Sequence, residues 1–159
     1  MRLRFGIGYD IHRFEKKRKL MLGGVEIAYD KGLAGHSDAD VVIHAICDAL
    51  LGALGKGDIG EHFPNTQDAY KDISSLVLLQ RLQTIVEAQG YKIGNIDTIL
   101  QAEVPKLNQY KEAMKEKIAS ALKIDASAVN IKATTMEGLG AIGKKEGIAA
   151  FASAVLISE

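Results

Sequence analysis

The alternation of apolar and polar positions predicts β-structure at the start of the chain. Residues 2–12 read as a strand, and residues 21–29 read as a short hairpin that turns at Gly23 and Gly24. Between them, residues 15–19 have the sequence EKKRK and are expected to form a solvated loop, because every side chain carries a charge.

A helix is expected to follow this hairpin. Apolar residues recur at helical spacing up to about Leu54, at Val42, Ile46, Ala49, Leu50 and Ala53. Ser37 is the expected N-cap, and Asp38 and Asp40 would lie near the positive end of the helix dipole. The helix thus begins in HSDADVVIH, residues 36–44, a stretch that concentrates two histidines and two aspartates.

The rest of the chain predicts further alternation of helices and strands. The expected elements are a polar loop over 56–72, a helix over 73–89 stopped by Gly90, a strand over 91–103, a helix over about 108–122, a strand over 129–135, an irregular glycine-rich segment over 134–147 and a closing strand over 148–158. This order predicts one α+β domain over residues 1–159, with helices on one face of a mixed sheet. An oligomer partner would cover the other face.

Composition and charge exclude some classes of protein. Lys plus Arg and Asp plus Glu both number 20, so the basic excess that is typical of nucleic-acid binders is missing. There is no apolar run of transmembrane length and no signal-peptide pattern, so a soluble, cytoplasmic protein is expected. The single cysteine, Cys47, excludes a disulfide within the chain, and it fits a small buried residue better than a nucleophile.

Two stretches carry residue types that bind metal ions. Asp10 and His12 are two positions apart on the first strand, so both side chains point to the same face. His44 lies between Asp40 and Asp48 at intervals of four on the helix, in a stripe beside the buried face. Asp10, His12 and His44 together would match a catalytic zinc site with one open position.

Each of these residues also has a simpler interpretation. Asp10 and His12 could form a surface pair, Asp40 could stabilise the first turn of the helix, and His44 could be a hydrogen-bonded histidine of the core.

Two later stretches suit phosphate and polyol binding. Lys132, Thr134, Thr135 and Glu137 end a strand, where an ammonium group and hydroxyls can hold phosphate and a carboxylate can bind Mg²⁺. The threonines could equally be ordinary strand residues. The sequence GDIG, residues 57–60, could hold hydroxyl groups through Asp58 and backbone amides, although an ordinary turn would look the same.

Taken together, these stretches resemble the 2-C-methyl-D-erythritol 2,4-cyclodiphosphate synthases. The resemblance rests on GYDIH (8–12), GGVEI (23–27), AGHSDADVVIHAICDALLGA (34–53), GDIGEHFPNT (57–66), NIKATTMEGLG (130–140) and EGIAA (146–150). These motifs occur in a consistent order from end to end, and their combination is far more specific than any one of them.

The resemblance implies roles for individual residues. Asp10, His12 and His44 would bind Zn²⁺, and Glu137 would bind a second ion, Mg²⁺ or Mn²⁺. The remaining implied residues contact the substrate: His36, Ser37, Lys132, Thr134 and Thr135 at the phosphates, Asp58, Gly60 and Asn65 at the methylerythritol, and residues 101–107 with Pro105 at the cytidine. The resemblance also implies a homotrimer with active sites between subunits.

The implied reaction is an intramolecular phosphoryl transfer. The 2-phosphate of 4-diphosphocytidyl-2-C-methyl-D-erythritol 2-phosphate would attack the β-phosphorus and release CMP. The attacking group is already an anion, so the reaction needs alignment and charge neutralisation more than a protein nucleophile.

Three positions depart from the family pattern. Asn65 stands where an aspartate is frequent beside the diol, Lys144 replaces an arginine and Ala141 an aromatic residue of the cavity on the trimer axis. Since lysine cannot form the bidentate fork of arginine, an isoprenoid diphosphate is not expected in that cavity. Residues 101–107 also match the family less closely than the other motifs.

Two other functions fit the same residues. A zinc-dependent phosphoester hydrolase would use Asp10, His12 and His44, with Asp40 or His36 as the base. A trimeric protein that only binds metal or nucleotide would explain the ligands but not the phosphate-type strand end.

Overall fold

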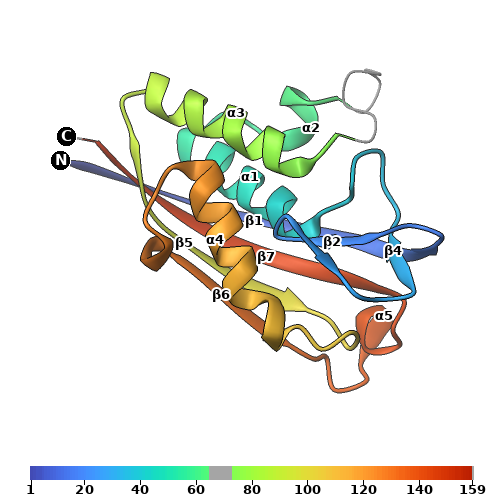
Figure 1. Ribbon diagram of the computed structural model, residues 1–159. Helices are drawn as coiled ribbons and strands as arrows, with labels where there is room; N and C mark the ends of the chain where they lie inside the picture. The colour runs from blue at the N-terminus through green and yellow to red at the C-terminus, as the bar shows by residue number, and fades with distance from the viewer. Residues whose placement is uncertain (65–72, 159) are drawn as a thin grey trace.

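The computed structural model describes residues 1–64 and 73–158, and its centre is a five-stranded sheet of order β4-β1-β7-β5-β6 (Figure 1). The strands are β1 (Arg2–Lys16), β4 (Lys31–Leu33), β5 (Lys92–Gln101), β6 (Val129–Thr134) and β7 (Gly147–Ser158). Strands β5 and β6 are parallel, whereas β1 pairs antiparallel with β4 and β7, and β5 with β7. The sheet is therefore mixed, as predicted.

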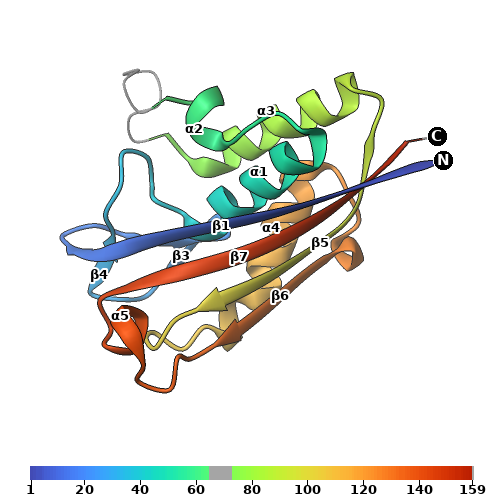
Figure 2. The same ribbon diagram turned by 180° about the vertical axis from the view of Figure 1, so that it is seen from behind.

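The long helices lie on one face of this sheet (Figure 1). They are α1 (Val41–Leu54), α3 (Ser75–Ala88) and α4 (Lys111–Leu122), and the shorter elements are α2 (Ile59–His62), α5 (Gly140–Gly143), the 3₁₀ turns Asn108–Tyr110 and Ala126–Ala128, and the hairpin of β2 (Leu20–Leu22) and β3 (Val25–Ile27). Helix α1 packs directly on β1 and β7, and α3 packs on α1. The view from behind shows the opposite face without a covering layer (Figure 2).

The structure corrects several expectations near the N-terminus. Strand β1 continues to Lys16 instead of ending at residue 12, and the short strand β4 pairs with its extension. Residues 15–19 are therefore not simply a loop. Within this run Arg18 is half-buried, and its guanidinium donates to the Gly35 carbonyl at 2.8 Å and to the Ser37 carbonyl at 2.6 Å.

The N-cap of α1 is Asp40, not Ser37. Its fully buried carboxylate accepts hydrogen bonds from the backbone amides of Ile43 at 3.1 Å, Gly23 at 2.8 Å and Gly24 at 2.6 Å. Burial raises the pKa of Asp40, while the three amides favour the charged form. Asp40 thus joins the β2–β3 turn to the start of α1, which leaves it unable to act as a general base.

Helix α1 approaches the sheet closely because β1 presents glycines beneath it. A Cβ atom on Gly6 would lie 2.0 Å from the Ala49 carbonyl oxygen, and one on Gly8 would lie 2.0 Å from the Ala45 carbonyl oxygen. Any side chain at these strand positions would push the helix outward. The two glycines therefore set the distance between β1 and α1 along the stretch from Ala45 to Ala53.

The uncovered face of β1 is apolar. Its side chains Leu3, Phe5, Ile7, Tyr9 and Ile11 are 46–71% exposed, and Phe151 of β7 is 46% exposed beside Tyr9, with ring centroids 4.6 Å apart. A contiguous apolar surface of this kind marks an interaction site more often than free surface. None of the helices in residues 1–64 and 73–158 has the length and apolar character needed to cross a bilayer.

Candidate metal centre and active site

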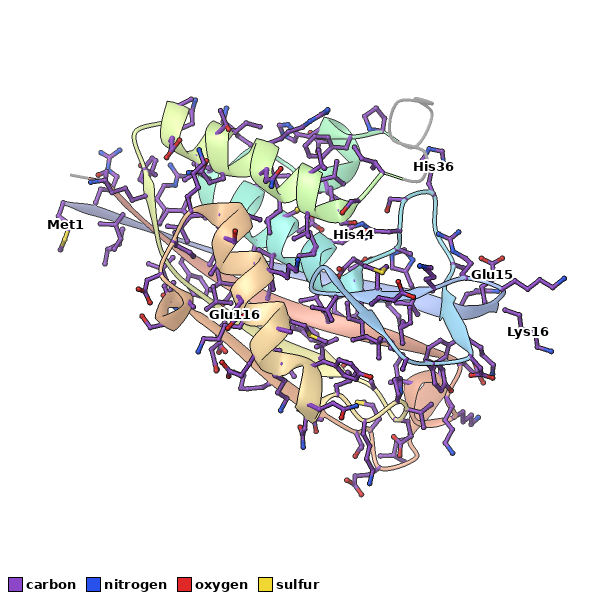
Figure 3. All side chains as sticks on the ribbon, in the orientation of Figure 1. Met1, Glu15, Lys16, His36, His44 and Glu116 are labelled. Atoms are coloured by element: carbon purple, nitrogen blue, oxygen red, sulfur yellow. The ribbon has the colours of Figure 1, made fainter. Side chains whose placement is uncertain are left out.

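Three predicted ligands meet where β1 passes beneath the first turn of α1. Asp10 and His12 lie on β1 and their side chains contact that of His44 on α1, which Figure 3 shows at the start of the helix. Asp10 Oδ2 lies 2.9 Å from His12 Nε2 and 3.0 Å from His44 Nδ1, and these two nitrogens are 3.3 Å apart. Strand and helix, separate in the sequence, are thus brought together as the zinc hypothesis requires.

The outer nitrogen of each histidine ring already has a protein partner. His12 Nδ1 lies 2.6 Å from the Ala34 carbonyl oxygen, which can only accept, so Nδ1 carries the hydrogen. His44 Nε2 lies 3.0 Å from Ser75 Oγ and 3.2 Å from Ser37 Oγ. These contacts orient both rings so that His12 Nε2 and His44 Nδ1 face Asp10.

Because these acceptor atoms lie close together, a positive charge placed among them is stabilised. Burial by itself would raise the pKa of Asp10, but hydrogen bonds with His12 and His44 hold it well below its usual range. Burial would likewise lower the pKa of His12, yet its hydrogen bond and ion pair with Asp10 raise it overall. The lowered pKa of Asp10 and the raised pKa of His12 have the same cause: positive charge is stabilised among the carboxylate and the two imidazole nitrogens.

The donor set fits a divalent metal ion. One carboxylate oxygen and two imidazole nitrogens, all within 4.8 Å of one another, form the ligand combination of catalytic zinc sites with a fourth position open. Within residues 1–64 and 73–158, this is the one group of three or more such ligands with that spacing. These residues could therefore hold Zn²⁺ with little rearrangement of the backbone.

The three predicted metal ligands line a cavity of about 270 Å³. His36 and Ser37, on the loop before α1, line it together with Ile59, Gly60 and Phe63. His36 Nε2 is buried and has no hydrogen-bond partner within the described part of the chain. Figure 3 shows His36 on this loop and His44 at the start of α1, so the predicted phosphate contacts lie beside the predicted metal ligands.

Part of the predicted polyol site lines the same cavity. Asp58 is the N-cap of α2, where its Oδ1 accepts from the Glu61 amide at 3.0 Å, and Gly60 lines the cavity. The GDIG stretch is thus the start of a short helix and not a simple turn. Asp48 on α1 accepts from the Ile59 amide at 2.8 Å, which anchors α2 to α1. Asn65 lies outside the described residues.

The second group of predicted residues gathers around the ends of β5 and β6. Thr135 Oγ1 donates to Glu137 Oε1 at 2.9 Å, and Glu137, at φ 51°, follows it in the turn. Lys132 Nζ lies 2.5 Å from Asp97 Oδ2, so its charge is partly matched. The carbonyl of Thr134 accepts from the Ala102 amide at 3.0 Å, which places residues 101–107 beside this turn.

Within one chain, the predicted metal ligands and the predicted phosphate-binding residues at the end of β6 do not form a single site. The side chains of Lys132, Thr134, Thr135 and Glu137 are exposed, and none of them lines the cavity of the metal ligands. Pro105 and Lys144 are also absent from that lining. Ala141 lines a second cavity of about 610 Å³ between the end of β1 and α5, and His12 lines both cavities.

Comparison with known proteins connects this geometry to a family. The sequence profile described as YgbB family matches residues 3–157. The chain belongs to the YgbB family. A relative from Caldicellulosiruptor bescii, 2-C-methyl-D-erythritol 2,4-cyclodiphosphate synthase, is 56% identical over 154 residues, which are 97% of this chain and 98% of the relative. The resemblance that the motifs indicated is therefore confirmed.

Solved structures of the YgbB fold superpose closely on this chain. The bifunctional IspDF from Campylobacter jejuni is 44% identical with a TM-score of 0.94, covering 98% of this chain and 42% of that longer one. The IspF from Plasmodium falciparum, solved as a CDP complex, is 37% identical with a TM-score of 0.87 and covers 99% and 97% of the two chains. The α+β fold with a mixed sheet is that of these proteins.

Sequence reasoning missed several residues that support the site. Ser75 contacts His44, and Arg18 fixes the two carbonyls on either side of His36. Arg18 gave no signal because it lies in a run of charges that looks like any solvated segment. Ser75 gave none because a serine in the first turn of a helix is ordinary.

Proposed function

We propose that the chain converts 4-diphosphocytidyl-2-C-methyl-D-erythritol 2-phosphate into 2-C-methyl-D-erythritol 2,4-cyclodiphosphate and CMP. An oxygen of the 2-phosphate attacks the β-phosphorus, a new P–O bond closes the ring, and the bond from the β-phosphorus to the bridging oxygen breaks. CMP leaves with that electron pair. In this reading residues 1–159 act as one domain in the cytoplasm, in the non-mevalonate route to isoprenoid precursors.

The observation that carries this proposal is the convergence of ligand atoms from Asp10, His12 and His44, all within 4.8 Å of one another. These residues would hold Zn²⁺, and Glu137 would hold Mg²⁺ or Mn²⁺. When bound, such ions withdraw charge from the reacting phosphates. The reaction joins two anionic phosphates, so it depends on metal ions that neutralise charge more than on a protein nucleophile.

The chain's own residues bind and align the substrate. His36 and Ser37 contact phosphate beside the metal ligands, and Asp58, Gly60 and Asn65 hold the methylerythritol hydroxyls. Thr134, Thr135 and Lys132 contact phosphate at the end of β6. Residues 101–107, with Pro105, hold the cytidine. Their common task is to keep the 2-phosphate in line with the bond that breaks, which lowers the entropic part of the barrier.

A homotrimer would join the two groups of residues. The metal ligands and the Thr134–Glu137 turn of one chain line different surfaces, so a complete site needs the turn of a neighbouring subunit. The apolar open face of β1 supports this assembly, because pairing it with a second copy would bury its exposed side chains. The CDP complex of the Plasmodium falciparum relative supports a cytidine nucleotide as the leaving portion.

The structure weakens the hydrolase alternative. Asp40 accepts three backbone amides and is fully buried, so it cannot serve as the base at a metal-bound water. Among the bases considered for hydrolysis, His36 remains.

Product analysis tests the proposal directly. The purified protein, with Zn²⁺ and Mg²⁺, is incubated with the cytidylylated methylerythritol 2-phosphate and followed by ³¹P NMR. Two coupled phosphorus signals of a cyclic diphosphate, with an equal amount of CMP, are expected. A linear phosphate with CMP would instead indicate the hydrolase. No turnover would leave a trimeric metal-binding protein as the better reading.

A further inference from the structure

We infer that Ser75, held by Asp38, is a positioning residue that fixes His44 for metal binding. Nothing in the sequence marks Ser75, and it does not line the cavity. Its side chain is fully buried and lies against the ring of His44, with Oγ 3.0 Å from Nε2. This inference rests on the proposed metal site.

The direction of the hydrogen bonds follows from the partners available to Ser75. Ser75 Oγ is in short contact with Asp38 Oδ1, and an ionised carboxylate can only accept, so the serine hydroxyl donates to Asp38. Having given its one hydrogen to Asp38, Ser75 Oγ can only accept from His44. His44 Nε2 therefore carries the hydrogen, and Nδ1 of the neutral ring keeps its lone pair.

That lone pair points at the metal position. His44 Nδ1 lies 3.0 Å from Asp10 Oδ2 and 3.3 Å from His12 Nε2, so it faces the other two ligand atoms. Histidine ligands generally donate their other ring hydrogen to a protein acceptor, which fixes the ring and increases the basicity of the ligand nitrogen. Ser75 and Asp38 provide such an acceptor for His44, as the Ala34 carbonyl does for His12.

Asp38 is itself rigidly held. Its Oδ2 accepts from the Ser75 amide at 2.9 Å, and its own amide donates to the Ile73 carbonyl at 3.3 Å. The same carboxylate therefore joins the start of α3 to the loop before α1. Because both its oxygens are occupied, Asp38 polarises the Ser75 hydroxyl in one fixed direction.

Ser37 is a poorer candidate for this role. Its Oγ lies 3.2 Å from His44 Nε2 and accepts from the Ala39 amide at 3.3 Å, but it has no carboxylate partner in the described structure. It also lines the cavity, where the proposed function places it at the substrate phosphates. The orientation of His44 is therefore assigned to Ser75 and Asp38.

The test measures Zn²⁺ affinity directly. The full-length protein, its Ser75→Ala variant and a Ser74→Ala control are titrated with Zn²⁺ in competition with a chromophoric chelator. Ser74 is exposed at the start of the same helix and makes no capping hydrogen bond with its side chain, so it controls for the substitution itself. Ser75→Ala is expected to raise the Kd for Zn²⁺ by about 10–100-fold, and Ser74→Ala to leave it unchanged.

Asp38→Asn separates positioning from simple structural support. Asparagine keeps only one acceptor oxygen, so when that oxygen accepts from the Ser75 amide, its NH₂ group faces Ser75 Oγ. A role limited to the start of α3 then predicts an unchanged Kd, because the Ser75 amide keeps its acceptor. The inferred role predicts a loss of Zn²⁺ affinity, because the Ser75 hydroxyl is freed to donate to His44 Nε2 and no longer holds the ring hydrogen at that nitrogen. If the Ser75→Ala variant does not fold, the Kd of the Asp38→Asn variant for Zn²⁺ still tests the positioning role of Ser75.

The outcomes distinguish this inference from the proposed function. Tight Zn²⁺ binding by the unmodified protein, with equal Kd values for the Ser75→Ala and Asp38→Asn variants, would overturn the role of Ser75 alone. Failure of the unmodified protein to bind Zn²⁺ would remove the proposed metal site and this inference with it.

Discussion

At the scale of single residues, the candidate site is defined by three converging acceptor atoms, from Asp10, His12 and His44. His12 donates through Nδ1 to Ala34, and His44 is hydrogen-bonded through Nε2, so the remaining ring nitrogens face the Asp10 carboxylate at 2.9 and 3.0 Å. A proton can partly satisfy this arrangement, as the raised pKa of His12 indicates. A divalent ion would satisfy all three atoms at once.

Replacing either histidine by alanine is expected to abolish Zn²⁺ binding and turnover. His12→Ala and His44→Ala each remove one of the two nitrogen ligands, and neither side chain is part of the apolar core. Both variants should keep the far-UV circular dichroism and oligomeric state of the unmodified protein. Metal analysis after dialysis checks the expectation, and a full zinc content in either variant would disprove that ligand assignment.

Glu137 is expected to act on the second metal ion only. Its carboxylate lies in the turn after β6, apart from the cavity of the zinc ligands. Glu137→Gln keeps the size of the side chain and its bond from Thr135, but it removes the negative charge that a hard cation requires. Zinc content should stay constant while the Mg²⁺ or Mn²⁺ concentration for half-maximal activity rises. An identical Mg²⁺ titration would remove Glu137 from this role.

At the scale of elements, the close contact between β1 and α1 builds the site. Two ligands come from the strand and one from the helix, so their spacing depends on how near the helix axis lies to the sheet. Gly6 and Gly8 allow that approach, since a Cβ at either position would collide with the helix backbone. Packing of a strand and a helix thus determines ligand geometry.

Gly8→Ala is therefore expected to damage both stability and metal binding. The new methyl group would meet the Ala45 carbonyl oxygen at 2.0 Å and the Ala49 nitrogen at 2.8 Å, and these backbone atoms cannot rotate away. Overpacking of this kind costs about 1–3 kcal/mol of unfolding free energy. Displacement of α1 should also raise the Kd for Zn²⁺.

A matched control for Gly8→Ala exists on the helix itself. A Cβ on Gly52 would meet only the Ile7 carbonyl oxygen, at an ordinary 3.6 Å, so Gly52→Ala should instead stabilise the protein by about 0.5–1 kcal/mol. Chemical denaturation measures the free energy of unfolding, which should fall for the Gly8→Ala variant and rise for the Gly52→Ala variant. Equal stability of the Gly8→Ala variant and the unmodified protein would show that α1 can move outward without cost.

At the scale of the whole molecule, the uncovered face of the sheet matters most. The helices cover one face, whereas the apolar side chains of β1 and β7 on the other face remain exposed in a single chain (Figure 2). The predicted zinc ligands and the Thr134–Glu137 turn also line different surfaces. Both features are explained if neighbouring copies pack on the open face and complete each other's sites.

Ile7→Glu is expected to break this assembly. Ile7 is 71% exposed on the open face, so a glutamate is tolerated in the monomer but would bring like charges into a symmetric interface. Sedimentation should show a monomer that retains Zn²⁺ but has lost turnover. Val77→Glu, an exposed apolar position on α3, is the matched control and should remain trimeric and active. A monomeric, fully active Ile7→Glu variant would place the complete active site within one chain.

The sequence by itself determined the order of the long helices and strands, the mixed α+β fold and the family. Periodicity revealed the long helices and strands because side chains alternate with a fixed period in each. The motifs also predicted that Asp10, His12 and His44 lie together as possible zinc ligands, and the structure brings these three side chains together. Short elements such as β4 and α2 were missed, since three or four residues carry no detectable period.

Only the tertiary structure decided how these residues meet. It showed Asp40 as a buried N-cap, and it brought Ser75 and Arg18 to the metal ligands and the adjacent loop. It also showed that Gly6 and Gly8 lie beneath α1. These relationships depend on contacts between segments distant in the chain, and a local pattern of apolar and polar residues does not encode such distances.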